Sequence, residues 1–214
     1  SSGHGESHLR ILGRDKWDVV ELRGMLGIVT NDLVDTCTRG MSSDFAEFPR
    51  YVTARDTVLS GFFSSIGVWE HHVVTPVMRE KADALLATLG VAHLADRLLT
   101  EMSSGEVRRV VIARALVHDP SSLVLDEPTN SLDLRATSEL RDAVRTIAQS
   151  GMSVLLVTHH LADIIPEIER VILLQGGRIV DDGPKEKLLT SARLSELFGV
   201  TVEVGRRGDF YHAW

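Results

Sequence analysis

The sequence has a single cysteine, no long apolar run and no excess of positive charge. Because Cys37 is the only cysteine among 214 residues, no disulfide can form within the chain, and we expect a reducing compartment. No apolar run approaches the roughly 20 residues of a membrane-spanning helix, and the first residues lack the layout of a signal peptide. The net charge of −7 gives no reason to expect nucleic acid as a partner. Any connection with a membrane must therefore come through a partner protein.

The composition that remains is typical of a globular protein. Hydrophobic residues make up 43% and charged residues 25% of the chain, and we predict a single domain over residues 1–214. Leu9–Leu12 and Gly27–Thr30 are short apolar runs that predict strands, and Trp17–Met25 between them has helical spacing. The chain therefore begins with a mixture of strand and helix.

Residues 35–115 are predicted to form a mostly helical subdomain within this domain. Thr57–Phe63 and Met78–Leu89 have helical periodicity, and Gly90 follows the second run as a helix stop should. We expect this helical lobe to be inserted between strands of a sheet.

The remaining chain alternates between helical patterns and continuous apolar strands. Such alternation predicts an α/β fold with a parallel sheet covered on both faces. The expected elements are a helix at Glu106–Val117, a strand at Leu123–Leu125, a helix at Leu134–Gln149, a strand at Val154–Val157, a helix at Leu161–Ile168, and a hairpin of Val171–Leu174 with Arg178–Val180.

Two adjacent carboxylates follow the apolar strand Leu123–Leu125. Open α/β sheets bind ligands at the carboxyl ends of their strands, and successive strand side chains point to opposite sides. We therefore assign Asp126 to Mg²⁺, directly or through water, and Glu127 to orienting and deprotonating an attacking water. The alternative is a polar strand end followed by a turn at Pro128.

Met102–Glu106 stands at the start of a basic helix. Small hydroxyl residues and a glycine at a helix N-terminus expose backbone N–H groups to an anion, and the helix dipole assists. Taken by itself, the segment is more simply interpreted as an N-cap, with Ser103 as the capping residue and Glu106 completing a capping box.

Two shorter elements follow the carboxylates along the chain. Ser131–Asp133 lies after a turn, and the strand Val154–Val157 leads to His159 and His160. A lone histidine at a strand end is usually structural, and a pair of histidines is no metal site without further ligands.

The order and spacing of these four elements resemble the motifs of ABC ATPases. The signature motif corresponds to Met102–Glu106, the Walker B strand with its catalytic glutamate to Leu123–Glu127, the D-loop to Ser131–Asp133, and the switch histidine to His159. Ser104 stands where the family usually has glycine, and Glu106 where it usually has glutamine. The resemblance implies a P-loop NTPase-like α/β fold, with a mainly parallel sheet, flanking helices and an inserted helical lobe.

One part of the family pattern is missing, namely the glycine-rich loop ending in Gly-Lys-Ser/Thr that holds the phosphates. Gly13–Lys16 does not fit it, because the preceding glycine and the following hydroxyl are absent. In the family this loop lies several tens of residues before the point where Ser1 falls, so we expect truncation, with the first strand and phosphate-loop helix missing. We then expect an inactive chain that binds ATP weakly and exposes apolar surface on Leu123–Leu125 and Val154–Val157.

The family mechanism implies ATP and Mg²⁺ as cofactors and a head-to-tail homodimer with a second ABC ATPase domain. Each ATP then lies between the phosphate loop of one subunit and the signature motif of the other. The resemblance implies nucleotide contacts for Ser103, Ser104, Gly105, Glu106, Asp133 and Asn31. It makes Glu127 and His159 the catalytic pair. Asn31 stands where the family has the Q-loop glutamine, and its shorter amide leaves a contact with Mg²⁺ open.

The implied function is that of the ATP-hydrolysing subunit of an ABC transporter. Val58–Phe63 resembles the helical lobe of importers of metal, siderophore or molybdate, and the resemblance places the protein in the cytoplasm, on the inner face of the membrane, held by permease subunits. One alternative is a soluble ABC ATPase acting on nucleic acid or the ribosome, although the usual paired domains or long coiled coils are absent. The other is a noncatalytic regulatory module, favoured if Ser1 were the true start but opposed by Glu127 and His159.

Overall fold

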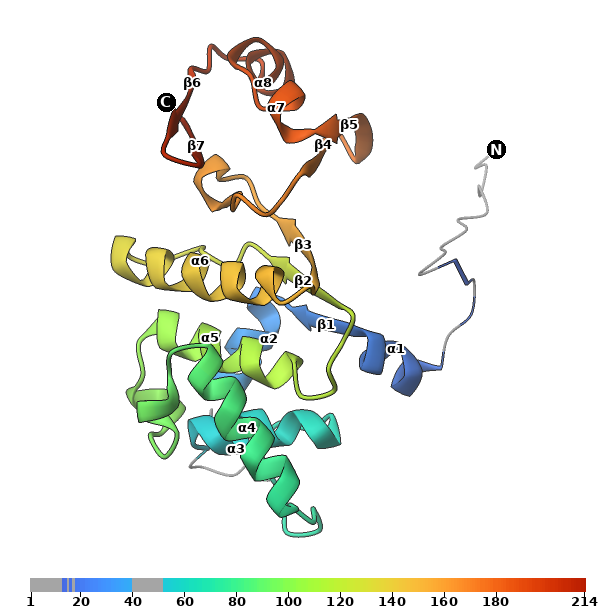
Figure 1. Cartoon of the computed structure of the whole chain (residues 1–214), viewed down its shortest axis with the longest axis vertical. Coiled ribbons are helices and arrows are strands. Elements are labelled where there is room, and N and C mark those ends of the chain that lie inside the picture. The colour runs from blue at the N-terminus through green and yellow to red at the C-terminus, as the bar shows by residue number, and fades with distance from the viewer. Residues whose placement is uncertain (1–12, 15, 17, 40–51) are drawn as a thin grey trace.

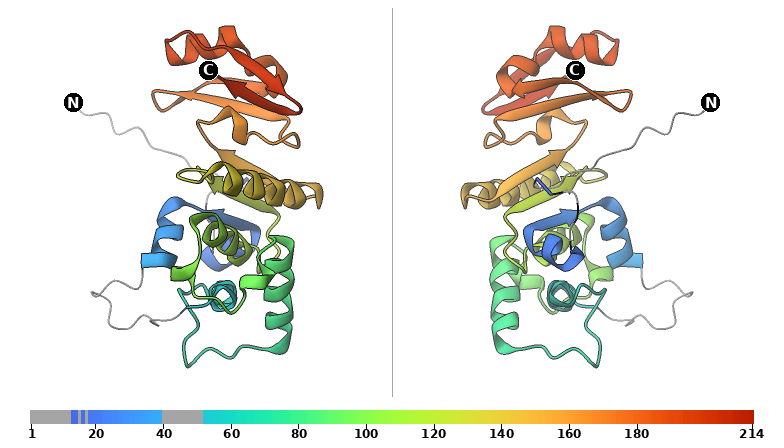
Figure 2. Two further views of the ribbon diagram at one scale, coloured as in Figure 1. Left: turned by 90° about the vertical axis from the view of Figure 1, so that its left-hand side faces the viewer. Right: turned by 90° about the vertical axis from the view of Figure 1, so that its right-hand side faces the viewer.

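A computed structural model describes residues 13–14, 16, 18–39 and 52–214 (Figure 1). The two side views in Figure 2 show the arrangement: a lobe of helices at one end, a parallel sheet with a long helix in the middle, and hairpins with two short helices at the other end. The predicted strand at Leu9–Leu12 lies outside the described residues. No helix within the described part of the chain combines the length and apolarity that crossing a bilayer requires.

The helices and strands follow one another in a mixed order along the chain. The helices are α1 (Val19–Met25), α2 (Asn31–Arg39), α3 (Ala54–Ser60), α4 (Pro76–Thr88), α5 (Ser104–Ala115), α6 (Leu134–Gln149), α7 (Lys185–Leu188) and α8 (Ser191–Phe198). The strands are β1 (Leu26–Val29), β2 (Ser122–Asp126), β3 (Ser153–Val157), β4 (Arg170–Gln175), β5 (Arg178–Pro184), β6 (Val204–Arg207) and β7 (Phe210–Ala213).

The central sheet consists of β1, β2 and β3, which run parallel in that order. Ile28 pairs with Val124, and Val124 pairs with Leu155, so these three side chains share one face of the sheet. The hairpin β4–β5 and the hairpin β6–β7 form two separate antiparallel pairs. The predicted parallel sheet with helices is thus confirmed, but the prediction that both of its faces are covered is wrong for the described residues, because one face leaves apolar side chains exposed.

The two faces of the central sheet differ in what covers them. Leu123 and Leu125 are fully buried on one face, in a core that also contains side chains of α5 and α6. The opposite face leaves Ile28 47%, Leu155 55% and Val157 45% exposed. The predicted exposure of the apolar strands is therefore right for Leu155 and Val157 and wrong for Leu123 and Leu125, because strand side chains alternate and the helices cover only one face.

The helical lobe comprises α3, α4 and α5, which pack against one another. In the sequence these helices lie between strands β1 and β2. Leu59 of α3, Leu86 of α4 and Val110 of α5 are each no more than 1% exposed. Thr75 caps α4, with its side-chain oxygen accepting from the backbone of Met78 at 3.3 Å. Apolar packing in the interior explains why this lobe forms three well-defined helices, with α5 buried along most of its length and α4 fully burying only Ala82 and Leu86.

One predicted helix is wrong. Leu161–Ile168 was expected to be helical, but only Leu161–Asp163 forms a single 3₁₀ turn, after which Ile164 is extended. Pro166 cannot donate to a helical hydrogen bond and disfavours helical backbone at the residue before it. The buried carboxylate of Asp163 also has partners elsewhere in the fold, which the next section describes.

Candidate active site

The carboxyl ends of β2 and β3 lie side by side and carry the predicted catalytic residues. Asp126 is the last residue of β2 and is half-buried, and Glu127 follows it. The backbone N–H of Glu127 donates to Val157 O at 2.8 Å, which extends the pairing of β2 with β3 by one bond. The next residues after β3 are Thr158 and His159. Parallel pairing therefore brings Glu127 and His159 together although 32 positions separate them.

The backbone of Glu127 is in the left-handed region, with φ at +47°. This conformation costs a residue other than glycine roughly 1–2 kcal/mol. Three contacts hold it: the N–H bond to Val157, and bonds to the carbonyl oxygen of Glu127 from Arg108 Nη1 at 2.9 Å and from the Asn130 N–H at 3.1 Å. Strained backbone of this kind clusters at functional sites, because the turn directs a side chain that chemistry requires.

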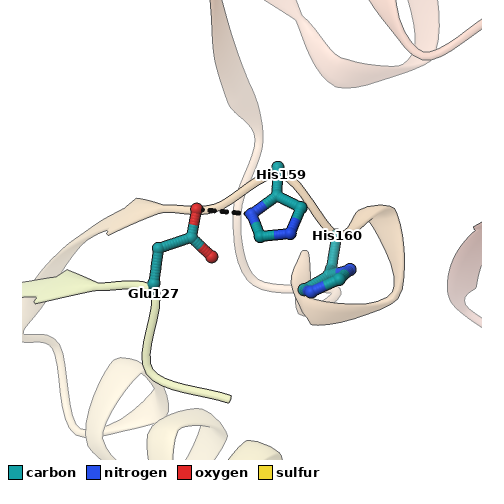
Figure 3. Close-up of side chains that lie close together, drawn as sticks. All are labelled: Glu127, His159 and His160. Carbon is teal, nitrogen blue, oxygen red and sulfur yellow. Dashed lines mark hydrogen bonds and ion pairs between the residues drawn. The ribbon is translucent and has the colours of Figure 1, made fainter. Parts of the chain in front are cut away.

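The carboxylate of Glu127 and the imidazole of His159 are hydrogen-bonded (Figure 3). Glu127 Oε1 lies 2.7 Å from His159 Nδ1. The other oxygen, Oε2, is buried and has no hydrogen-bond partner among the described residues, and it faces the side where His159 and His160 lie. The side chain of His159 is 61% exposed, against 23% for Glu127. The arrangement is thus a proton acceptor within a sheltered turn, beside a histidine open to a ligand.

A buried carboxylate ties together the two loops that carry this pair. Asp163, 3% exposed, accepts hydrogen bonds from the hydroxyl of Thr129 and from that of Thr158, the latter at 3.1 Å. Arg141 of α6 adds an ion pair with Asp163 at 3.1 Å. Thr129 follows Glu127 closely and Thr158 precedes His159, so one side chain fixes both loops. Sequence reasoning missed Asp163, which it placed in a helix.

Arg108 joins the helical lobe to the site. This buried side chain extends from α5 and donates to the carbonyl oxygens of Glu127 at 2.9 Å and Pro128 at 2.5 Å. It also donates to Asn31 Oδ1 at 2.9 Å. Burial lowers the pKa of the Arg108 guanidinium, and the charge of Asp35 opposes that shift. The amide oxygen of Asn31 is thus engaged by Arg108, while its predicted contact with Mg²⁺ stays a prediction.

The segment predicted to bind a nucleotide forms a capping box at the start of α5. The backbone N–H of Ser103 donates to Glu106 Oε2 at 2.7 Å, and the N–H of Glu106 donates to Ser103 Oγ at 3.4 Å. The bond from the Ser103 backbone is the main cause that lowers the pKa of Glu106. Ser103 and Ser104 are exposed, but the Ser103 hydroxyl also donates to Glu106 Oε2 at 2.9 Å and so belongs to the cap. The cap and the binding role are compatible.

Gly105 and Asp133 lie where the starts of α5 and α6 meet. Gly105 is buried, and a Cβ atom in its place would lie 2.6 Å from the Cβ of Ala136. Asp133 caps α6, since its Oδ1 accepts from the N–H of Ala136 at 2.7 Å. The next residue, Leu134, is 91% exposed. The side chain of Leu134 therefore stands in solvent beside the two predicted contact segments.

Comparison of the sequence with models of known families shows which family the chain belongs to. The family model described as ABC transporter matches residues 21–130, just over half of the chain. The chain belongs to the ABC transporter family. The match includes the capping box of α5, strand β2 and Glu127, so it covers most of the elements that build the site.

Relatives in the ABC transporter family are ATP-binding proteins. The chain is 39% identical over 154 residues to the uncharacterized ABC transporter ATP-binding protein YlmA of Bacillus subtilis, covering 71% of this chain and 58% of YlmA. It is 37% identical over 130 residues to the hemin import ATP-binding protein HmuV of Bradyrhizobium diazoefficiens, covering 57% of this chain and 48% of HmuV. The chain thus spans about half the length of these relatives.

Solved structures of ABC transporters share the fold. A metal-chelate type ABC transporter in an inward-facing conformation matches with a TM-score of 0.66 at 22% identity, over 88% of this chain and 84% of that one. The ADP conformation of an ATP-binding cassette matches with a TM-score of 0.67 at 21% identity, over 86% of this chain and 72% of that one. The predicted ABC ATPase fold is confirmed at the level of the sheet and its helices.

Proposed function

We propose that this chain is the ATP-binding and ATP-hydrolysing part of an ABC transporter. The observation that carries the proposal is the hydrogen bond between Glu127 and His159 at the carboxyl ends of two parallel strands. Glu127 accepts the proton of the attacking water, and His159 holds the terminal phosphate and keeps the carboxylate in place. The hydrogen bonds of Arg108 to the Glu127 backbone and of Asp163 to Thr129 and Thr158 hold the two loops that carry this pair.

The donor set of this chain fits Mg²⁺. Magnesium is usually bound through one or two carboxylates, several waters and the phosphates of the substrate. Asp126, half-buried at the last residue of β2, supplies such a carboxylate. When bound, the ion would neutralise charge that develops on the phosphates. Asp126 at the strand end and Glu127 in the left-handed turn after it therefore have separate tasks in this proposal.

The second half of each site comes, in our proposal, from a partner ABC ATPase domain in a head-to-tail homodimer. The hydroxyls of Ser103 and Ser104 and the backbone at Gly105 and Glu106 contact a nucleotide held by the partner, and Asp133 crosses the interface. The solved dimer of an ADP-bound cassette shows that relatives of the same fold associate in pairs.

The phosphate loop is the part of the machinery that the sequence does not contain. We propose that the chain alone binds ATP weakly for this reason, since that loop and its lysine supply most phosphate contacts in the family. In the transporter, permease subunits hold the protein at the inner face of the membrane. Relatives named for the import of hemin and molybdenum favour an importer of metal-containing substrates. The intact Glu127 and His159 argue against a noncatalytic module.

The proposal is tested by supplying the missing loop. A phosphate-loop segment from an ABC ATPase is fused ahead of residue 1, and ATP hydrolysis is measured with and without Glu127→Gln. Because the amide cannot accept a proton, turnover should fall by about 10²–10⁴-fold while ATP binding is retained. ATP that binds without being hydrolysed should make the closed dimer accumulate, and gel filtration with Mg-ATP should show it.

Asp126→Asn is the matched control, because it removes a carboxylate one position away. This variant should lose Mg-ATP binding and, with it, the dimer. Hydrolysis by Glu127→Gln at the rate of the parent would contradict the assigned base. Micromolar Mg-ATP binding by the 214-residue chain without the added loop, measured by calorimetry, would contradict the role given to that loop.

A further inference from the structure

The fold gives the histidine pair a third potential metal ligand. Glu127, His159 and His160 each offer one ligand atom, and these atoms lie within 4.8 Å of one another. Within the described residues, this is the one group of three such side chains that lies close enough to bind one ion. The carboxylate comes from the turn after β2 and both imidazoles come from the loop after β3, so the sheet, not the sequence spacing, assembles the group (Figure 3).

The geometry of the three side chains suits a small divalent ion. The ring centroids of His159 and His160 are 3.9 Å apart, with the rings tilted at 42°. Glu127 Oε1 lies 2.7 Å from His159 Nδ1, and the buried oxygen Oε2 has no hydrogen-bond partner in the described chain. Ligand atoms around tetrahedral zinc lie roughly 3.3 Å apart, given bond lengths of about 2.0–2.2 Å. Ligand atoms that already lie within 4.8 Å of one another need only small movements to reach that spacing, and both imidazoles are exposed.

We propose that Glu127, His159 and His160 bind a divalent transition-metal ion such as Zn²⁺. Two imidazoles with one carboxylate and an open position form a donor set that zinc accepts, whereas Mg²⁺ prefers oxygen ligands alone. The site is therefore distinct from the Mg²⁺ carboxylate assigned to Asp126. Cys37 does not compete for the ion, because its thiol is buried and burial raises its pKa.

The loop that carries the histidines is fixed independently of any ion. The N–H of His160 donates to Thr158 Oγ1 at 3.0 Å, and that hydroxyl donates in turn to the buried Asp163 at 3.1 Å. The backbone thus presents both rings on one side of Glu127 before a metal arrives. A preformed loop reduces the ordering that binding requires.

Zinc at this position inhibits ATP hydrolysis, a consequence that rests on the function proposed above. The ion occupies the carboxylate that accepts a proton from water and the imidazole that holds the phosphate. His160 has no assigned role in hydrolysis. It adds the third ligand that turns the pair of Glu127 and His159 into a potential metal site. The chain would therefore respond to transition metal as well as to nucleotide.

Metal binding is tested without nucleotide, so its result does not depend on the ATPase assignment. The 214-residue chain is titrated with Zn²⁺ by calorimetry and by competition with a colorimetric chelator. We expect one ion per chain at this site and an affinity that falls at least about tenfold in His160→Ala and in Glu127→Gln, since loss even of outer partners weakens metal sites 10–100-fold. Circular dichroism and the melting temperature establish that each variant is folded.

His71 provides a matched control within the same chain. It is also one of two adjacent histidines, and the ring centroids of His71 and His72 are 4.4 Å apart. His71→Ala should leave zinc binding unchanged, because that pair is not part of a three-ligand group. Equal zinc affinity of His160→Ala, Glu127→Gln and the unmodified chain would overturn the site. Zinc that binds but leaves ATP hydrolysis by the loop-supplied protein unchanged would overturn the inhibition.

Discussion

The helical lobe and the central sheet differ in how completely they are covered. The lobe of α3, α4 and α5 buries apolar side chains such as Leu59 and Leu86 in its interior, while Val77 in the first turn of α4 is 71% exposed. The sheet is covered on the face of α5 and α6 only, and Ile28, Leu155 and Val157 are exposed on the other face. The lobe therefore has a buried apolar interior of its own. The sheet instead has one apolar face in solvent and carries the functional turns at the carboxyl ends of its strands. Similar substitutions in the two regions should have different effects.

The largest effect is expected from truncating an apolar side chain in the lobe. Leu86→Ala removes a fully buried side chain of α4 and should reduce the free energy of unfolding by about 2–5 kcal/mol. Leu155→Ala, the same change on the open face of the sheet, should cost no more than about 0.5 kcal/mol. Urea denaturation of both variants measures the difference. Equal losses would show that the open face is covered in solution, for instance by self-association.

A smaller effect is expected where the two regions meet. Arg108→Met keeps the bulk of the side chain but removes the side-chain donor to the carbonyls of Glu127 and Pro128, of which the first keeps the Asn130 N–H, and this should cost about 1–3 kcal/mol. Arg135→Met is the control, because Arg135 is 89% exposed and its pair with Glu139 is worth at most about 1 kcal/mol. Hydrogen exchange should also show faster opening of the Glu127 turn in Arg108→Met alone. Unchanged exchange there would mean that Arg108 does not hold the turn.

The smallest effect concerns the capping box of α5 and depends on pH. The pKa of Glu106 is lowered in the folded protein, chiefly by the hydrogen bond from the Ser103 backbone. The bond therefore stabilises the fold above the unfolded pKa of glutamate, about 4.3, and the contribution is lost as pH falls through the folded pKa. Glu106→Gln, which cannot titrate, should approach the stability of the parent between pH 5 and about 3. A stability difference that is constant with pH would contradict this role.

The sequence was sufficient to predict the elements whose side-chain pattern is local. The bounds of α6 match the prediction, Leu134–Gln149, because Asp133 caps its start and Gly151 follows its end. The predicted cores of β2 and β3 lie within strands that extend one residue further at one or both ends, because continuous apolar runs are typical of buried parallel strands. By contrast, α2 was not predicted, since its sequence is mostly polar and only a few side chains are buried.

The site was predictable in part for a similar reason. Family resemblance assigned Glu127 and His159 from motifs, and parallel pairing places them in contact. Arg108 and Asp163 could not be assigned, because most of their partners lie far away in sequence: Thr129 is 34 and Arg141 is 22 positions from Asp163. Arg108 acts on carbonyl oxygens 19 and 20 positions away and on Asn31, 77 positions away. Contacts with backbone oxygen leave no pattern in the residue types of the partners.

The left-handed backbone of Glu127 sets the stability of the fold against the identity of the side chain at this position. At φ +47°, glycine would be the more stable occupant of position 127, by roughly 1–2 kcal/mol before any change in side-chain contacts. Exchange of Glu127 for glycine would therefore couple a gain in backbone stability to the loss of the carboxylate, so thermostability and the proposed proton acceptor make opposite demands on this one position.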